Sequence, residues 1–436
     1  MGVRRLVLAL VTGVAVAAGS SLLVAPAGEA AVACSSVTWS EGPTYTAGQQ
    51  VTYNAHLYQA LVTHTAWAGT GWNPAATPTL WKDLGACTGG PTTPTTPPVT
   101  TPPTTTPPVT TPPTTTPPAT GCAVKGRPAG KVLQGYWENW DGASNGVHPG
   151  MGWIPINDSR ITQHGYNVLM AAFPVIRSDG TVLWENGMDA GVKVPTAAEI
   201  CAAKAAGATV LMSIGGATAG VDLSSSAVAD RFVATIVPIL KQYNFDGIDI
   251  DIETGLTGSG TITTLSTSQA NLIRIIDGVL AQMPANFGLT MAPETAYVTG
   301  GSVTYGSIWG SYLPIIKKYL DNGRLWWLNM QYYNGSMYGC SGDSYAAGTV
   351  QGFTVQTQCL NNGLTIQGTT IRIPYDKQVP GLPAQPGAGG GYMTPALVTQ
   401  AYNSVPSIKG LMTWSINWDG SKSWTFGDNV KRLQGR

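Results

Sequence analysis

The segment from Pro91 to Thr120 consists almost entirely of proline and threonine, in short repeats such as TTPPVTTPP. Such a sequence cannot bury a hydrophobic core, and it favours an extended polyproline-type conformation of about 3.1 Å per residue. The chain therefore cannot fold as one continuous body. We place a linker at residues 89–121 and expect a small folded unit before it and a larger one after it.

Charge and aromatic content limit the possible partners of this chain. The 436 residues include 23 basic and 23 acidic side chains, and only 11% are charged. This balance argues against nucleic acid or an anionic membrane surface as the main partner. The 14 tryptophans and 17 tyrosines suit a surface that stacks against flat, neutral ligands such as sugar rings. We expect a monomer.

Residues 1–33 are typical of a secretory signal peptide. Arg4 and Arg5 precede an apolar run from Leu6 to Val24, and small, alanine-rich residues follow. Glycines and a serine interrupt the apolar run, which disfavours a retained membrane span. We therefore expect cleavage between Ala27 and Ala33 and a secreted, extracellular protein.

The six cysteines are an even number, which fits disulfide formation in an oxidising compartment. We expect Cys34 to pair with Cys87, because the two bracket the first unit, and Cys340 to pair with Cys359, because they lie close in sequence. Cys122 would then pair with Cys201. Other pairings stay open, because sequence alone does not fix connectivity. The histidines are scattered without ligand spacing and no CxxC pair occurs, so we expect no metal and no cofactor.

The first unit, residues 34–88, is rich in aromatic residues for its size. Residues 51–53 and 57–62 are typical of two short strands, with Asn54 and Ala55 between them. A unit this small cannot bury all of its rings, so some are expected to contact a ligand.

The sequence of this unit resembles a known carbohydrate-binding module. The motif YNAHLYQA at 53–60, followed by GWNP at 71–74 and LW at 80–81, resembles the chitin-binding modules of carbohydrate-binding families 5 and 12. The resemblance implies a small all-β module in which Trp72 stacks on the ligand, with Trp67 as a companion. Trp39 and Trp81 are expected in the core.

Short apolar runs alternate with helical patterns in residues 122–436. The expected strands are 131–137, 168–176, 209–216, 245–253, 288–295, 326–334, 369–375 and 410–417. The helical patterns include 197–206, 227–242, 269–282 and 394–405. This alternation favours an α/β fold of the (β/α)8 TIM-barrel type over an open doubly wound sheet. No GxGxxG motif follows the first strand, which further disfavours a dinucleotide-binding fold.

The fourth expected strand carries the sequence DGIDIDIE at 246–253. Side chains two apart share one face of a strand, so Asp249, Asp251 and Glu253 form an acidic row opposite the isoleucines. At a spacing of about 6.6 Å, mutual repulsion is expected to keep at least one proton bound near neutral pH. General acid catalysis requires such a proton. The alternative, a solvated acidic face, is disfavoured by the stacking of like charges.

Other polar and aromatic residues are expected at the carboxyl ends of the strands, where function gathers in this fold. They lie in the segments 136–140, 213–216, 291–294, 330–334 and 414–419. Together they surround the carboxylates with aromatic rings and amides, which suits the cleavage of a sugar chain.

The spacing of the acidic strand matches a known signature. Asp246-x-x-Asp249-x-Asp251-x-Glu253 matches the DxxDxDxE motif of glycoside hydrolase family 18, the chitinases and their relatives. The SxGG motif at Ser213 accompanies it, and the whole C-terminal unit resembles the compact bacterial and plant-type branch. The resemblance implies retaining, substrate-assisted hydrolysis of chitin and chito-oligosaccharides, with the sugar's own 2-acetamido group as nucleophile.

The resemblance also implies roles for individual residues. Glu253 would be the general acid and then the base, Asp251 would hold the acetamido N–H, and Asp249 would tune the proton of Asp251. Tyr333 would orient the acetamido oxygen. The residues expected to bind the substrate are Gln331, Asn334, Trp414, Met291 and Tyr136. Asp246 has the opposite strand parity, so we expect a structural role for it.

Three further expectations concern the cleft and the alternatives. A structural role is favoured for Glu294. Only about 35 residues separate the seventh and eighth expected strands, which leaves no room for the inserted domain that walls a tunnel in some relatives. An open cleft and internal cleavage follow.

An endo-β-N-acetylglucosaminidase shares the signature, and a non-catalytic chitin lectin shares the barrel. The chitin-type module disfavours the first, and the presence of Glu253 and Asp251 disfavours the second.

Overall fold

The computed structural model describes residues 37–40, 43–61, 64–66, 73–75, 81–87, 121–140, 148, 151–217 and 220–436. They fall into two compact units, Met1–Pro112 and Pro113–Arg436, which we describe separately. The expected signal peptide, the linker up to Thr120, Trp67 and Trp72 lie outside the described residues. Within these ranges, no helix is long and apolar enough to cross a membrane, and no cluster of side chains could hold a metal ion.

The first unit is built on a four-stranded sheet with the order β1-β3-β4-β6. Its strands are β1 (Val37–Thr38), β3 (Gln50–Tyr53), β4 (His56–Ala60) and β6 (Trp81–Ala86), and β2 (Thr44–Tyr45) pairs separately with β5 (His64–Thr65). Asn54 and Ala55 have left-handed φ values of 47° and 61° and turn β3 back into antiparallel β4. This two-residue hairpin is the turn that the sequence predicts.

Trp81 lies in the core of the first unit. It is 1% exposed and its ring meets that of Tyr45 edge to face at 5.0 Å. Trp39 packs against Tyr53 with ring centroids 5.2 Å apart. The expected core position of Trp81 is therefore confirmed, whereas Trp39 is half-buried and packs against the core from its edge. Cys87 is disulfide-bonded, and its expected partner Cys34 lies outside the described residues.

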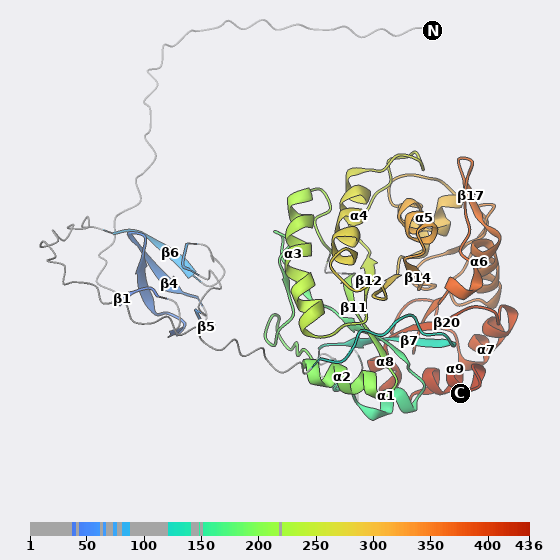
Figure 1. The fold of residues 1–436 in the computed structure, drawn as a ribbon, viewed down its shortest axis with the longest axis horizontal. Helices are drawn as coiled ribbons and strands as arrows, with labels where there is room; N and C mark the ends of the chain where they lie inside the picture. Colours follow the sequence, from blue (N-terminus) through green and yellow to red (C-terminus); the bar gives the residue numbers. More distant parts are fainter. Residues whose placement is uncertain are drawn as a thin grey trace, which may run out of the picture. The chain divides into compact units, whose positions relative to one another are not determined.

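The second unit is a (β/α)8 barrel, as the sequence predicts (Figure 1). Its eight strands run, in sheet order, as β14 (Leu325–Leu328), β13 (Gly288–Met291), β12 (Gly247–Ile252), β11 (Thr209–Gly216), β8 (Val168–Ala172), β7 (Val132–Glu138), β20 (Gly410–Trp414) and β19 (Gly381–Pro383). All neighbours are parallel. Parallel bridges from Leu328 to Gln378 and from Gln331 to Gly381 join the two outer strands and close the ring.

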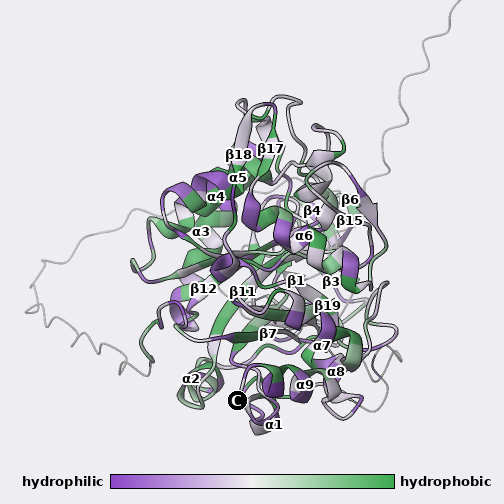
Figure 2. Ribbon diagram, turned by 90° about the vertical axis from the view of Figure 1, so that its right-hand side faces the viewer, coloured by the Kyte–Doolittle hydropathy of each residue, from purple (hydrophilic) through white to green (hydrophobic). Residues whose placement is uncertain are grey.

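Helices surround the strands and cover the outer face of the ring (Figure 1). They are α1 (Ser159–Gln163), α2 (Ala197–Ala205), α3 (Ser226–Gln242), α4 (Thr267–Leu280), α5 (Leu313–Asp321), α6 (Val350–Asn362), α7 (Pro395–Ser404), α8 (Ile416–Gly420) and α9 (Thr425–Leu433). Figure 2 shows both hydrophilic and hydrophobic residues on α3, α4 and α5. In α3, for example, Phe232, Ile236 and Leu240 recur every four residues and are buried. The four helices expected from the sequence are present, with ends within two residues of those predicted.

The seventh strand is not where the sequence predicts it. The segment 369–375 contributes instead to an antiparallel hairpin of β17 (Leu364–Ile366) and β18 (Thr369–Ile371). Gln367 and Gly368, with φ of 48° and 80°, form its tight turn. A turn this short can join only antiparallel strands, because a parallel neighbour needs a long crossover connection. The true seventh strand, β19, has only three residues beside Pro380, so its signal is weak. The fully described connection from β19 to β20, residues 384–409, contains α7 and no further domain.

Asp246 lies just before β12, at the opposite end of that strand from Glu253. It is fully buried, and its Oδ1 is 2.7 Å from the Nζ of Lys204. The backbone N–H groups of Lys125 and Val210 donate to its two carboxylate oxygens at 2.7 and 2.9 Å. Asp246 therefore joins the entry of the barrel to β11 and α2, which confirms the expected structural role.

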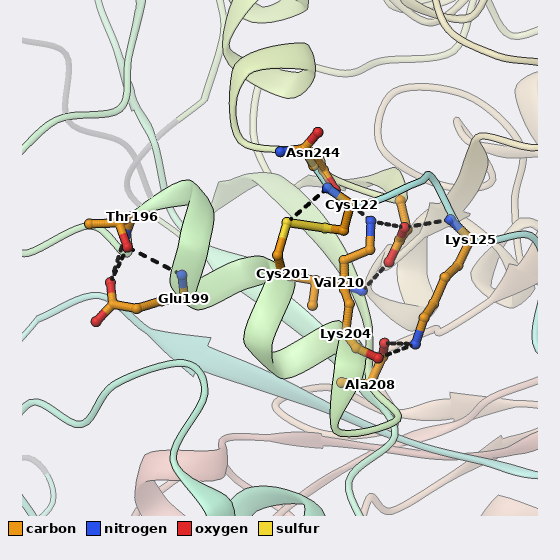
Figure 3. Close-up of a disulfide and its surroundings, with 10 residues drawn as sticks. Cys122, Lys125, Thr196, Glu199, Cys201, Lys204, Ala208, Val210 and Asn244 are labelled. Carbon is orange, nitrogen blue, oxygen red and sulfur yellow. Dashed lines mark hydrogen bonds and ion pairs between the residues drawn. A yellow bond between two sulfur atoms is a disulfide. The ribbon is translucent and has the colours of Figure 1, made fainter. Parts of the chain in front are cut away.

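A disulfide lies beside this ion pair and ties the start of the unit to α2 (Figure 3). It joins Cys122 to Cys201, and a second disulfide joins Cys340 to Cys359. Both pairings are those predicted from the sequence. In Figure 3 the side chain of Lys125 also reaches the carbonyl oxygens of Lys204 and Ala208, at 2.5 and 2.7 Å.

We predict that Asp246→Asn strongly destabilises the barrel, because it leaves the ammonium of Lys204 buried without its counter-charge. Breaking a buried pair in this way costs about 3–5 kcal/mol of unfolding free energy, measurable by urea unfolding of the full chain. The matched control is Asp230→Asn, whose ion pair with Arg274 is more than half exposed and should cost less than about 1 kcal/mol. Equal losses for both variants would contradict the assignment.

Candidate functional site

Asp249 lies inside the barrel with no exposed surface, and its carboxylate accepts four hydrogen bonds. The donors come from the strands around it: Tyr136 Oη at 2.7 Å, Ser213 Oγ at 2.8 Å, Thr290 Oγ1 at 2.7 Å and Asn329 Nδ2 at 3.1 Å. Burial raises the pKa of Asp249, and the hydrogen bonds oppose that rise. The four donors favour the ionised carboxylate.

Asp251 and Glu253 are bridged by the side-chain amide of Gln331. Its Nε2 lies 2.9 Å from Asp251 Oδ1, 3.0 Å from Glu253 Oε1 and 3.1 Å from the carbonyl oxygen of Ala292. Because the amide has only two hydrogens, the three acceptors share them. Gln331 therefore holds the two carboxyl groups in a fixed relative position.

The surroundings of this pair favour a bound proton. Burial raises the pKa of Asp251 well above its usual range, and the negative charges of Glu253 and Asp249 raise it further. Burial also raises the pKa of Glu253; the hydrogen bond from Gln331 opposes this, and the charge of Glu294 adds to it. The pair thus keeps a proton at a pH where exposed carboxyl groups have lost theirs, in agreement with the prediction from strand spacing.

Two tyrosines fix the end of β12 that carries Glu253. Tyr312 accepts a hydrogen bond from the N–H of Ile252 at 3.0 Å and donates one to its carbonyl oxygen at 2.9 Å. Tyr297 donates to the carbonyl oxygen of Glu253 at 2.5 Å. The isoleucines of β12 face the outer hydrophobic core, as their parity predicts, so the acidic row faces the barrel interior.

The SxGG motif allows β11 to approach the acidic row closely. Gly215 has φ of 108°, and a Cβ there would lie 2.1 Å from the carbonyl oxygen of Asp251. A Cβ on Gly216, with φ of 84°, would meet the ring of Phe173 at 2.9 Å. Only glycine fits both the backbone conformation and the space at these positions.

Asp251 and Glu253 open into a pocket of about 180 Å³. Its lining consists of Phe173, Gly216, Ala217, Asp251, Glu253, Gln331, Tyr333, Asn334, Ala388 and Trp414. Six of the residues expected at the site are therefore brought together here. A second pocket of about 470 Å³ shares Phe173, Gly216, Ala217 and Trp414 with the first, so the two form one continuous cleft.

Trp414 forms one wall of both pockets and is held by other rings. Its centroid lies 5.4 Å from that of Tyr136, 6.0 Å from Trp140 and 5.9 Å from Phe173. The rings of Trp414 and Phe173 are nearly parallel, with an interplanar angle of 14°. Such a flat aromatic surface suits stacking against a sugar ring.

A buried polar chain anchors the residue after Trp414. Ser415 donates to Oε1 of Glu138, whose other oxygen lies 2.6 Å from Nε2 of His148. Nδ1 of His148 lies 2.7 Å from the carbonyl oxygen of Met151, so both ring nitrogens face acceptors. Burial lowers the pKa of His148, but the hydrogen bond to Glu138, the charge of Glu138 and backbone hydrogen bonds together outweigh it, so the pKa is raised. Glu138 thus fixes the backbone beside Trp414 without lining either pocket.

Tyr333 and Asn334 also line the smaller pocket. Burial raises the pKa of Tyr333 well above its usual range, and the charges of Asp251 and Glu253 add to this, so the phenol keeps its proton and can donate. Asn334 has a left-handed φ of 64°. It exchanges two hydrogen bonds with Gly390, at 2.9 and 2.7 Å, which fix the loop after β19.

Two expected substrate-binding residues do not reach the cleft. Met291 is fully buried in the outer core, because its neighbour Thr290 faces the barrel interior and successive side chains alternate. Tyr136 is 1% exposed and its hydroxyl is bound to Asp249. Tyr136 therefore supports the site through Asp249, and the prediction of direct contact for both residues is wrong.

The prediction from sequence missed several supporting residues. Thr290 and Asn329 have the same strand parity as Ala292 and Gln331, so parity at neighbouring strand ends could have identified them. Ser213 belongs to the SxGG motif, but its contact with Asp249 was not foreseen. No sequence pattern points to Tyr297 and Tyr312, which lie in the loop after β13 and at the start of α5.

The chain matches two known sequence families. Residues 132–334 match glycosyl hydrolases family 18, and residues 38–82 match carbohydrate-binding module family 5/12. Endochitinase 37 of Trichoderma harzianum is 83% identical over 309 residues, which are 71% of this chain and 92% of that protein. Chitinase Chi52 of Paenibacillus xylanexedens is 31% identical over 87% of this chain and 88% of its own length.

Solved structures resemble the fold. A family GH18 chitinase from Chromobacterium violaceum is 30% identical and superimposes with a TM-score of 0.61, covering 92% of this chain and all of its own. A putative chitinase A from Streptomyces coelicolor is 27% identical with a TM-score of 0.55, covering 70% of this chain and 98% of its own.

We predict that Glu294→Gln lowers the pKa of Glu253. Glu294 is half-buried, accepts no side-chain hydrogen bond from the described residues, and raises the pKa of Glu253 through its negative charge. Removing that charge lets Glu253 lose its proton at lower pH. NMR titration of ¹³C-labelled glutamate side chains measures the change. Glu199→Gln, at a half-buried position on α2 that lines neither pocket, serves as the control. An unchanged or increased pKa of Glu253 would contradict the role of Glu294.

Proposed function

Because the chain belongs to glycosyl hydrolases family 18, we propose that it is a secreted endochitinase that hydrolyses internal β-1,4 linkages between N-acetylglucosamine units. The observation that carries the proposal is the Asp251–Gln331–Glu253 arrangement, a carboxyl pair with a retained proton in an aromatic-walled cleft. Relatives 83% and 80% identical to this chain are named endochitinases, which supports the same activity.

Glu253 acts as the general acid. It lies at the end of β12, is only half-buried, and opens into the pocket. Its raised pKa keeps the proton that the glycosidic oxygen takes up as the bond breaks. Once deprotonated, the same carboxylate accepts a proton from the water that completes the reaction.

The nucleophile is the acetamido oxygen of the sugar whose linkage is cleaved. Asp251 is the other carboxyl group that lines the pocket, and its strongly raised pKa makes it a poor nucleophile. The acetamido oxygen therefore attacks C1 and closes an oxazolinium ring, while Asp251 accepts the acetamido N–H. Tyr333 donates its hydroxyl hydrogen to the acetamido oxygen. Water then attacks C1 from the face that the leaving group vacated and breaks the C1–O bond of the oxazolinium ring, so the two inversions retain the configuration at C1.

The remaining residues hold the sugar and the carboxylates in place. Trp414 provides the flat surface under the reacting ring, and Asn334 lines the same pocket. Asp249 presents a buried negative charge behind Asp251, and Tyr136 positions Asp249. This charge stabilises the cation that forms on the sugar.

Internal cleavage follows from the shape of the cleft. The connection of residues 384–409 carries no domain that could roof the site. The two pockets form one continuous cleft along the barrel mouth, which a chain can enter sideways. An open cleft of this kind favours cuts within the polymer rather than release from its ends.

The proposal extends to the rest of the chain. Residues 1–33 direct export, and the disulfides fit an oxidising, extracellular setting. Residues 34–88 bind chitin through Trp72 and Trp67, and residues 89–121 tether this module to the catalytic unit at 122–436. The match to carbohydrate-binding module family 5/12 supports chitin as the polymer.

We predict that Glu253→Gln lowers kcat for a soluble chito-oligosaccharide by about 10²–10⁴-fold, since the amide cannot donate an acidic proton. Glu199→Gln, at a position that lines neither pocket, should retain wild-type kcat. Early products of the wild-type enzyme should be the β-anomer by NMR. An active Glu253→Gln variant would contradict the assignment. An inactive wild-type protein that binds chitin would indicate a lectin, and release of N-glycans in place of chitin cleavage would indicate an endo-β-N-acetylglucosaminidase.

We predict that Trp72→Ala weakens binding of the full chain to insoluble chitin by about twofold to tenfold, the worth of one aromatic stacking contact. A pull-down with chitin beads measures binding. Hydrolysis of soluble oligosaccharides should be unchanged, because the module is tethered separately from the active site. Leu61→Ala, at a position 47% exposed, is the control. Unchanged binding of the Trp72 variant would remove this residue from the proposed site.

A further inference from the structure

The larger pocket of the cleft lies on the non-reducing side of the cleaved bond. Glu253 must contact the glycosidic oxygen, and it lines only the smaller pocket. Trp414 lies under the sugar ring whose C1 reacts, and the larger pocket lies beyond Trp414. It therefore receives the sugar units that precede this ring, while the leaving group extends past Glu253 in the other direction.

The wall of the larger pocket is mainly apolar and aromatic. The rings of Trp140 and Phe173 are nearly parallel, with centroids 6.4 Å apart and an interplanar angle of 19°. Val175, Met188 and Val192 add apolar surface. Such a wall stacks on the flat faces of sugar rings whatever group is attached to C2.

Asp189 is the one charged residue among the described residues that line this pocket. Its side chain is exposed, and one carboxylate oxygen accepts the N–H of Ala190 at 2.7 Å. No ion pair engages it within the described ranges. Lys193, four residues later, lies over the ring of Trp153 at 5.2 Å from the centroid. The carboxylate of Asp189 is therefore available to a cation in the pocket.

The two pockets make different demands on the group at C2 of the sugar. The smaller pocket requires an acetamido group, because that group supplies the nucleophile. The larger pocket has no such requirement, and its carboxylate attracts the ammonium that replaces the acetamide when chitin is deacetylated. A neutral acetamide gains nothing comparable from Asp189.

We infer that Asp189 makes the larger pocket selective for glucosamine, so that the enzyme acts preferentially on partially deacetylated chitin. It then cuts after an N-acetylglucosamine that is preceded by glucosamine. This inference rests on the proposed function. An exposed ion pair corresponds to a preference of about twofold to fivefold, and salt screens it.

The experiment uses the full chain and chitosan with about half of its units acetylated, at acidic pH, where the amine is protonated. Products are labelled at the reducing end and sequenced by mass spectrometry. For the wild type, we expect N-acetylglucosamine at the new reducing end. We also expect about twofold to fivefold enrichment of glucosamine at one of the units before it. High salt should reduce the enrichment.

The variants isolate the charge of Asp189. Asp189→Asn keeps the shape of the side chain and should lose the enrichment, whereas Glu185→Gln, an exposed residue outside the lining, should keep it. Random composition at these units in wild-type products, or unchanged enrichment in Asp189→Asn, would overturn the inference. The wild type and Glu185→Gln should cleave a fully acetylated hexamer equally. Failure of the wild type on that substrate would instead overturn the proposed function.

Discussion

The site depends on one buried negative charge, that of Asp249, which the barrel surrounds with four hydrogen-bond donors. Those donors come from different strands, so each strand must be in register for the charge to be satisfied. A buried carboxylate without partners would cost several kcal/mol. The same charge helps to keep the proton on Asp251. Folding and chemistry therefore share a single electrostatic constraint.

Much of the fold could be predicted because burial leaves a periodic pattern in the sequence. The alternation in β12 identifies the strand and separates Asp249, Asp251 and Glu253 from the isoleucines. The seventh strand could not be found in this way. The three residues of β19 follow Pro380 and end in Pro383, so they carry no periodicity, and only pairing with β20 makes them a strand. The nearby β17–β18 hairpin has the stronger local signal but lies outside the barrel sheet.

The acidic row and most of the pocket lining could also be predicted, since strand ends gather at one mouth of a barrel. The error at Met291 came from strand parity. Met291 lies one residue from Thr290, and that single step moves its side chain from the interior to the outer core. Residues 329, 331 and 333 share the interior parity, which would have identified Asn329. The positions of Tyr297 and Tyr312 arise from tertiary packing alone.

The closure of the ring between β14 and β19 rests on isolated bridges rather than a continuous ladder. Three backbone hydrogen bonds, at 2.9, 2.9 and 3.0 Å, join these two segments without a regular ladder, so amide exchange with solvent should begin there. We call this closure between β14 and β19 the seam. Gln331 and Asn334 follow β14 on one side of the seam, and Trp414 ends β20, the strand next to β19 on the other side. Small widening of the seam would therefore change the width of the cleft and leave the carboxylates of β12 in place. The position at which the barrel opens most easily is therefore separate from the strand that carries Glu253.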